Sequence, residues 1–141
     1  WRKELRPDSG GVGKFRGGLG QYMDVGAQEG HEFDFQAMFD RVDHPARGRQ
    51  GGKRGAPTTI RQNDGAKMKG KGKQFVAHGK RVILAFPGGA GYGPASERDP
   101  ALVKRDLARG YISAEIAARD YGMNENDIAA VQDAIATGDM V

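Results

Sequence analysis

The chain has 141 residues, which is enough for one compact domain and too few for two. Hydrophobic residues make up 38% of the sequence, while 23 residues are Gly and 6 are Pro. This apolar content is small for a loop-rich chain. We therefore expect a marginally stable monomer that gains stability by packing on something larger.

The sequence contains no Cys, which excludes a disulfide scaffold, a cysteine nucleophile, a zinc finger and an iron–sulfur site. The longest apolar run, residues 82–86, is far shorter than the roughly 20 residues needed to cross a bilayer. The first residues are too polar for a signal peptide, so we expect a cytoplasmic protein without membrane contact. Because Trp1 would not permit removal of a preceding initiator Met, we also expect that an N-terminal piece is missing or cleaved.

The net charge of +4 combines two unlike parts. Residues 41–81 contain 12 Lys and Arg residues but only two Asp, a balance of +10, and the flanks carry a balance of −6. Such a local positive field favours a local anion: a nucleic acid backbone, a phosphate-bearing substrate or an acidic face of a partner protein. A solvated surface loop is the other interpretation.

The first half of the chain predicts short strands between long loops. Residues 1–20 are rich in Gly and lack helical or strand periodicity, which indicates a structured loop or an arm. A short strand is expected at residues 21–25, and a half-buried one at 31–36, where Phe33 and Phe35 would share the buried face. Residues 43–73 read as a surface loop carrying at most one short strand.

The second half predicts a hairpin and then helices. Residues 73–86 favour a hairpin with a tight turn at 78–80, whose second strand is apolar on both faces and therefore central. After a second glycine loop at 87–94, helices are expected near 97–110, at 113–122, and from Asn124 or Asn126 to about Ala136. The sequence thus predicts an α+β fold with a β-rich, Gly-rich portion at 1–94 and a helical tail at 95–141, together forming one domain docked on a larger subunit.

Two interpretations of the first glycine loop remain open. Its backbone N–H groups, with Lys14 and Arg16 nearby, could cradle a phosphate; alternatively, its glycines form tight turns at the edge of a subunit contact. Neither glycine loop fits the dinucleotide pattern G-x-G-x-x-G. Residues 65–71 match G-x-x-x-x-G-K, but Gly72 follows where Ser or Thr is required, so we regard the match as coincidence.

No catalytic or metal site emerges from the residue pattern. Only His31 has acidic neighbours, and on an alternating strand it faces away from Glu32, so no metal site is predicted. Ser9 follows Asp8 but has no nearby His that could activate it. Tyr92, between two glycines, is interpreted as an anchor packed over a turn.

A nucleic-acid-binding module is a competing class of function. Such modules interleave aromatic side chains with basic ones to stack bases. In residues 41–81 the only aromatic residue other than His is Phe75. This shortage disfavours the nucleic-acid interpretation, and no nucleic acid partner is predicted.

Several blocks resemble, in order, the C-terminal region of the hydantoinase B family. Residues 5–21 (LRPDSGGVGKFRGGLGQ) resemble the opening of that region, 51–57 its G-A-P segment, and 87–93 its P-G-G-G-G-Y-G run. Residues 97–100, 110–113 and 117–122 resemble its helical end. The resemblance spans residues 4–122 and covers only the last part of full-length members.

The resemblance implies a subunit of an ATP-dependent hydantoinase, 5-oxoprolinase, or acetone or acetophenone carboxylase. Larger hydantoinase A-like and hydantoinase B-like subunits are the implied partners, with ATP and a divalent metal on those partners and no cofactor on this chain. The favoured member is the small subunit of an acetophenone carboxylase-like complex, in which bicarbonate and an enolised ketone are phosphorylated before carbon–carbon bond formation. The alternative is a cyclic amide hydrolase of the hydantoinase or 5-oxoprolinase type.

The resemblance assigns no residue of this chain to a catalytic step. Lys14, Arg16 and Arg54 are the candidate contacts for a phosphate or another anion. The candidate loop or interface residues are Asp8, Ser9, Gly10, Gly11, Gly17, Gly18, Gly88, Gly89 and Tyr92.

Overall fold

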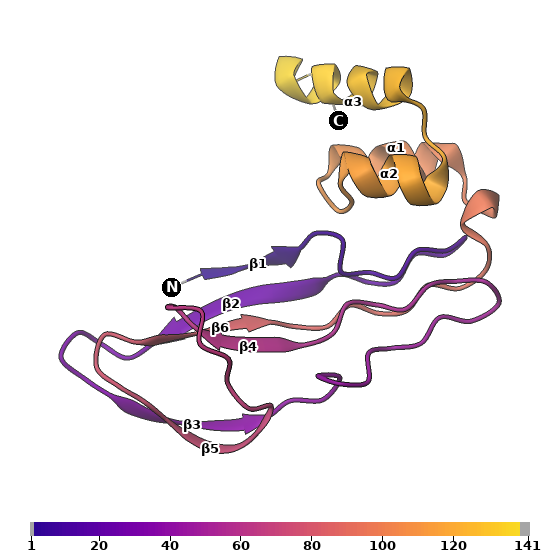
Figure 1. Ribbon diagram of the computed structural model, residues 1–141. Helices are drawn as coiled ribbons and strands as arrows, with labels where there is room; N and C mark the ends of the chain where they lie inside the picture. Colours follow the sequence, from indigo (N-terminus) through magenta and orange to yellow (C-terminus); the bar gives the residue numbers. More distant parts are fainter. Residues whose placement is uncertain (1, 139–141) are drawn as a thin grey trace.

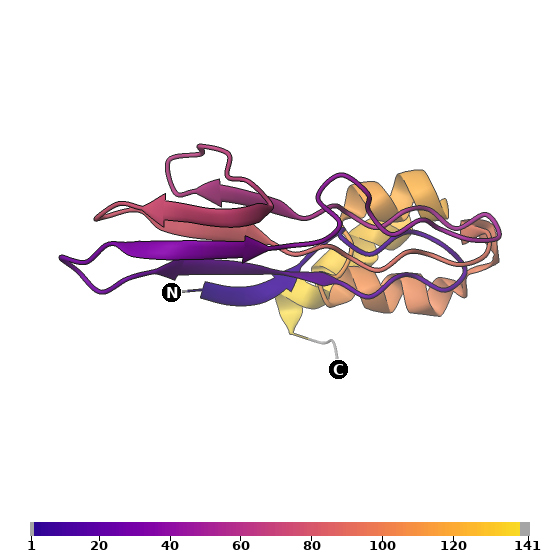
Figure 2. The same cartoon turned by 90° about the horizontal axis from the view of Figure 1, so that it is seen from below.

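A computed structural model describes residues 2–138 of the chain. Its strands occupy one half of the molecule, while the helices and three glycine-rich segments occupy the other half (Figures 1 and 2). The elements in chain order are β1 (Arg2–Arg6), β2 (Gly20–Gly26), β3 (Phe33–Met38), β4 (Thr59–Gln62), β5 (Lys71–Val76), β6 (Arg81–Ala85), a 3₁₀ turn η1 (Ala95–Glu97), α1 (Pro100–Ala108), α2 (Ala114–Tyr121) and α3 (Glu125–Thr137). This arrangement confirms the predicted α+β fold with a β-rich N-terminal portion.

The larger sheet has four antiparallel strands in the order β1–β2–β6–β4. Strand β6 is central, as predicted from its apolar residues, and Val82 and Leu84 on it are buried. Strand β1 was not predicted, since residues 1–20 were expected to be a loop or an arm. Its residues are mostly charged and lie at the sheet edge, where they pair with β2 and where Arg6 donates hydrogen bonds to the carbonyls of Pro57 and Phe86.

The predicted hairpin of residues 73–86 is wrong in its pairing. The tight turn exists, with the Lys80 amide donating to the Ala77 carbonyl at 3.0 Å. However, β5 pairs with β3 in a separate two-stranded ribbon, and β6 pairs with β2 and β4. The separation lets Val76 and Val82 become fully buried in the cluster between the two sheets.

The core of the strand half lies between the sheet and the ribbon. Ile60, Val76, Val82 and Leu84 are buried there, and half-buried aromatic residues from β3 pack against them. Phe33 and Phe35 both contact this cluster, which confirms their predicted common face.

Side-chain caps define the helices. Asp99, Ser113 and Asn124 accept hydrogen bonds from the first-turn amides of α1, α2 and α3, so the third helix begins after Asn124 and not after Asn126. Gly122 ends α2 in the left-handed conformation with φ of 70°. Among residues 2–138 no helix is long and apolar enough to cross a membrane.

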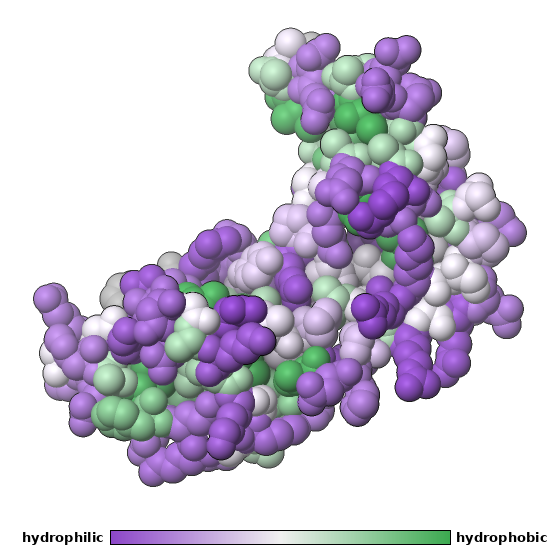
Figure 3. All heavy atoms as spheres, in the orientation of Figure 1, coloured by the Kyte–Doolittle hydropathy of each residue, from purple (hydrophilic) through white to green (hydrophobic). Residues whose placement is uncertain are grey.

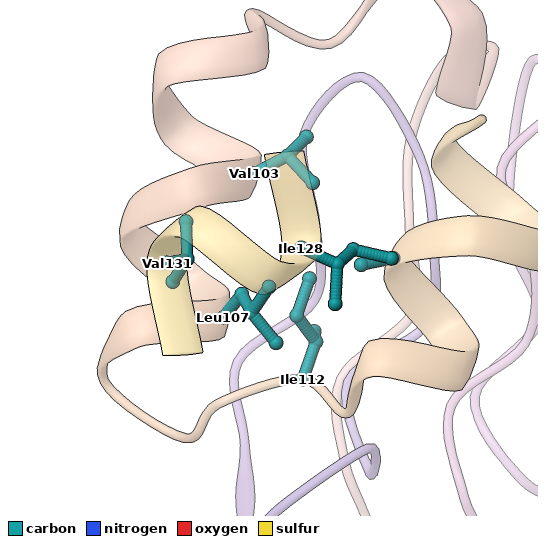
Figure 4. Close-up of a cluster of buried hydrophobic side chains, with 6 residues drawn as sticks. Val103, Leu107, Ile112, Ile128 and Val131 are labelled. Atoms are coloured by element: carbon teal, nitrogen blue, oxygen red, sulfur yellow. The ribbon is translucent and has the colours of Figure 1, made fainter. Parts of the chain in front are cut away.

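The helices have a core of their own. Val103, Leu107, Ile112, Ile128 and Val131 converge between α1 and α3 and the loop before α2 (Figure 4). Hydrophobic residues accordingly gather under α3 and along the side of the strands on an otherwise mainly hydrophilic face (Figure 3). Residues 2–138 therefore form two small apolar clusters in place of one large core.

Three glycine-rich segments run side by side between these clusters, and we call residues 9–18, 48–55 and 88–93 the glycine bundle. Each segment bonds to both others: the Gly11 amide donates to the Gly89 carbonyl at 2.8 Å, the Lys53 amide to the Val12 carbonyl at 2.7 Å, and the Gly91 amide to the Lys53 carbonyl at 2.9 Å. Backbone hydrogen bonding thus replaces apolar packing in this part of the molecule.

Glycine is required in the bundle because the three backbones approach too closely for a side chain. A Cβ atom on Gly17 would lie 2.1 Å from the Gly89 carbonyl oxygen, and one on Gly88 would lie 1.8 Å from that of Ser9. Both distances are far below van der Waals contact, so neither position accepts even Ala without separating the segments.

Adjacent glycines in the bundle give a matched pair of substitutions. We expect Gly17→Ala to lower the free energy of unfolding by about 3 kcal/mol or more, because its methyl group overlaps the backbone of the neighbouring segment. Gly18→Ala should change it by no more than about 1 kcal/mol, since a Cβ atom there meets nothing within 4 Å. Urea unfolding of the purified protein, followed by circular dichroism, measures both; equal effects would contradict the close packing.

Candidate functional site

The three candidate anion contacts all lie in the glycine bundle but differ in what surrounds them. Lys14 Nζ forms an exposed ion pair with Glu97 at 2.9 Å, and Arg16 forms one with the buried Asp106. Arg54 is exposed and makes no side-chain hydrogen bond or ion pair with residues 2–138. Only Arg54 is therefore free to meet an external anion without first leaving an internal partner, and the anion-binding role of all three stays a prediction.

A buried cluster of charges joins the glycine bundle to the helices. The carboxylate of Asp106 on α1 is fully buried and accepts hydrogen bonds from Arg16 Nε at 2.9 Å and from Arg98 Nη2 at 2.6 Å. The guanidinium groups also lie over aromatic rings, Arg16 over Tyr111 at 5.6 Å and Arg98 over Tyr121 at 5.8 Å. We call Arg16, Arg98 and Asp106 the arginine cluster.

The environment of Asp106 keeps it ionised. Burial by itself raises the pKa of its carboxyl group, but the hydrogen bonds and charges of Arg16 and Arg98 outweigh burial and hold the pKa below its ordinary value of 3.8. Arg98 further donates from Nη1 to the Lys14 carbonyl at 3.1 Å. The cluster thus attaches α1 to the bundle by charge-assisted hydrogen bonds.

Two further contacts attach α2 to the bundle and to Asp8, the residue before it. Asp8, with a positive φ of 58°, accepts a hydrogen bond from the Ser113 amide at 2.7 Å, next to the start of α2. Lys53 forms an ion pair with Asp120, whose side chain is almost completely buried. The candidate interface residue Asp8 therefore contacts a helix terminus of its own chain.

The sequence reasoning missed Asp106, Arg98 and Asp120. A signal for Asp106 was present, because it lies beside Val103 and Leu107 on the apolar face of α1, where a carboxylate requires a buried partner. No comparable signal marks Arg98, whose partner is set by the path of the chain between η1 and α1.

Four of the candidate glycines, two in the proposed phosphate cradle and two in the second glycine loop, use their amides in hydrogen bonds within the chain. The amide of Gly11 donates to Gly89 at 2.8 Å, that of Gly17 to Gly11 at 2.9 Å, that of Gly88 to Ala56 at 3.2 Å, and that of Gly89 to Gly18 at 2.9 Å. These four donors hold the bundle together and are not directed at an empty space. For Gly10, a Cβ atom would lie 2.1 Å from the Gly17 carbonyl oxygen, so the two backbones are closely packed at this position.

Ser9 is buried and hydrogen-bonded to the backbone at both ends of the β1–β2 connection. Its side chain is buried, with Oγ donating to the Arg6 carbonyl at 2.6 Å and accepting from the Gly20 amide at 2.8 Å. These bonds join the end of β1 to the start of β2 and use the one hydrogen that the hydroxyl group can donate.

Tyr92 lies at the surface of the bundle, with half of its side chain exposed. Its ring lies against that of Phe15, with the ring centroids 6.3 Å apart. Residues 15 and 92 are also bridged through their backbones, the amide of each donating to the carbonyl of the other. Tyr92 is therefore held firmly but is not covered by the described part of the chain.

Other ionisable groups show no reactive arrangement within residues 2–138. No group of three or more His, Cys, Asp or Glu residues there could hold a metal ion. His78 Nε2 accepts a hydrogen bond from the Gly30 amide at 3.0 Å, which joins two loops at the far end of the strands.

We expect Asp106→Asn to lower the free energy of unfolding by about 3–5 kcal/mol, because it leaves two buried guanidinium groups without a carboxylate. Asp133→Asn on the exposed surface of α3 is the matched control and should change it by no more than about 0.5 kcal/mol. Urea unfolding measures both variants. A loss below about 1 kcal/mol for Asp106→Asn would show that the cluster is not needed to hold α1.

The same pair of variants tests the pH dependence. Since the pKa of Asp106 is lowered on folding, its contribution is fully present above the ordinary value of 3.8 and is lost as the pH falls through the lower, folded value. Part of the loss of stability below pH 3.8 should therefore be absent in Asp106→Asn and retained in Asp133→Asn. Unfolding curves at several acidic pH values provide the comparison.

Comparison with known proteins identifies the family. The model of the family described as hydantoinase B/oxoprolinase matches residues 1–95, which include the whole glycine bundle. An uncharacterised protein of Methanocaldococcus jannaschii is 35% identical over 120 residues, which are 83% of this chain and 21% of that protein. The B-type component of a putative D-/L-hydantoinase of Pseudomonas sp. is 30% identical over 132 residues, covering 89% of this chain and 22% of that protein.

Solved structures share the fold. The crystal structure of ATP-dependent caprolactamase from Pseudomonas jessenii matches 96% of this chain and 25% of its own chain, with 29% identity and a TM-score of 0.72. Nucleotide-free acetone carboxylase matches 97% of this chain and 24% of its own, with 19% identity and a TM-score of 0.63. The chain therefore spans only a fifth to a quarter of these relatives. By its sequence and its fold, it belongs to the hydantoinase B/oxoprolinase family.

Proposed function

We propose that this chain is part of an ATP-dependent enzyme complex that acts on a carbonyl compound, and that it completes the assembly without carrying the reaction alone. The observation behind this proposal is the match of 96% of the chain to a quarter of ATP-dependent caprolactamase. The buried charges support a structural role, since Arg16, Arg98 and Asp106 are occupied with one another.

Partners and cofactors follow from the same proposal. This chain matches only about a quarter of its relatives. In this proposal the other three quarters of the fold are supplied by the same polypeptide or by larger hydantoinase A-like and hydantoinase B-like subunits. ATP and a divalent metal are expected on those larger parts.

Two reactions are candidates. ATP-dependent hydrolysis of a cyclic amide is supported by 30% identity to the putative hydantoinase component and 29% identity to the beta component of caprolactamase. Carboxylation of an acetophenone-like ketone with bicarbonate is supported by the likeness in fold to acetone carboxylase. The higher identities favour the cyclic amide, and the ketone is the second candidate.

Substrate-dependent ATP hydrolysis distinguishes the two reactions. The complex isolated through a tag on this chain should hydrolyse ATP when hydantoin or caprolactam is added, without need for bicarbonate. A carboxylase would instead require acetophenone and bicarbonate together and would incorporate labelled bicarbonate into an acid product. If neither addition stimulates ATP hydrolysis, both candidate reactions are contradicted.

Arg54 is the one candidate anion contact without an internal partner among residues 2–138, so its neutralisation separates binding from folding. We expect Arg54→Gln to raise the KM for the anionic substrate, ATP or bicarbonate, by about tenfold, which corresponds to one charge-assisted hydrogen bond of about 1.4 kcal/mol. Arg61→Gln, an exposed position on β4, is the control and should leave the KM unchanged. An unchanged KM in Arg54→Gln, with the complex intact, would show that Arg54 does not contact the anionic substrate.

A further inference from the structure

Three exposed side chains form a row on the glycine bundle. Phe15 is bridged to Tyr92 in antiparallel fashion, and Arg49 is bridged to Tyr92 on its other side in parallel fashion. Residues directly opposite one another in a β-bridge project to the same face, so Phe15, Tyr92 and Arg49 lie side by side. We call them the aromatic–arginine row.

The row combines exposure with rigidity. The side chains of Phe15 and Tyr92 are 61% and 52% exposed, although most large apolar side chains of the molecule are covered. Their backbones are fixed by hydrogen bonds from the Phe15 amide to the Tyr92 carbonyl at 2.9 Å and back at 3.0 Å, and the Gly93 amide donates to the Arg49 carbonyl at 3.0 Å. A preformed row of this kind loses little conformational entropy when another surface covers it.

The charge beside the row is uncompensated. The side chains of Arg47 and Arg49 form no ion pair with residues 2–138, whereas Lys14 and Lys53 in the same bundle are paired with acidic residues of the helical half. An opposing surface would therefore need carboxylates at this edge. Tyr and Arg at the centre of a rigid patch are also the residues that carry most of the binding energy in protein interfaces.

The outward face of the β3–β5 ribbon, which also exposes large apolar side chains, differs in this respect. Met38 and Phe75 are exposed there, but the neighbouring Lys71 and Lys73 are already paired with carboxylates of the same region. Because these two lysines are paired, they do not require carboxylates from another protein. This face therefore supplies control positions of similar exposure.

We propose that the aromatic–arginine row is the docking surface for the remainder of the hydantoinase B-like fold. The docked surface presents an apolar pocket to Phe15 and Tyr92 and carboxylates to Arg49 and Arg47. Two observations identify what docks there. The unpaired arginines call for a surface with carboxylates, and this chain matches only 21–25% of each relative, so the rest of such a fold has to contact it. This inference rests on the proposed function.

Capture of the native complex tests the row by substitution. With a tag on this chain, we expect Tyr92→Ala and Arg49→Glu each to reduce recovery of a hydantoinase-family chain, identified by mass spectrometry, by about tenfold or more. Phe75→Ala and Arg61→Glu are the matched controls and should recover as much as the unsubstituted chain. Equal recovery by the row variants would overturn the inference while leaving the proposed function in place.

Photo-crosslinking tests the contact where both parts belong to one polypeptide. Replacement of Tyr92 by p-benzoylphenylalanine should yield, on irradiation of the native protein, a crosslink to a hydantoinase-family segment outside these 141 residues. The same probe at Phe75 should yield none. A crosslink from position 92 to nucleic acid, or no crosslink in a protein that contains the larger family segment, would overturn the row as a docking surface. Absence of any hydantoinase-family segment in the native protein would overturn the proposed function as well.

Discussion

The close approach of three backbones in the glycine bundle is the constraint on which the other features depend. A Cβ atom on Gly11, Gly17 or Gly91 would lie within 2.2 Å of a carbonyl oxygen of a neighbouring segment, so the segments share one rigid arrangement or separate. These segments carry Arg16 of the arginine cluster and all three residues of the aromatic–arginine row. The positions of these side chains are therefore set by backbone packing and not by the side chains themselves.

Electrostatics then determines how the helical half is held. The bundle contributes Arg16 and the segment before α1 contributes Arg98, and both guanidinium groups form ion pairs with the same buried carboxylate, that of Asp106. Detaching α1 would expose three charged groups to water but would also break hydrogen bonds at 2.6–2.9 Å that form in a water-poor environment. The attachment is consequently specific in register, because only one rotation of α1 presents Asp106 to both guanidinium groups.

The sequence predicted correctly those features that depend on residues close together in the chain. The apolar pattern of Val82 and Leu84 predicted a central strand, and Ser113 and Gly122 predicted the ends of α2, because burial and capping act within a few residues. The pairing of β5 with β3 joins segments across a long stretch of chain, and nothing in either segment specifies that distance. The charged strand β1 and the packed glycines likewise lack periodicity, so their structure follows from neighbours that the sequence alone does not locate.

The glycine loops show both cases: the sequence marked them as loops, but their packing depends on distant segments. As an isolated segment the first loop suggested a phosphate cradle or tight turns at a subunit contact, and the structure places its Gly11 and Gly17 amides in hydrogen bonds within the bundle. Because Phe15 and Tyr92 remain exposed above closely packed backbones, a surface that covers them has to be complementary to rings whose backbone positions are already fixed.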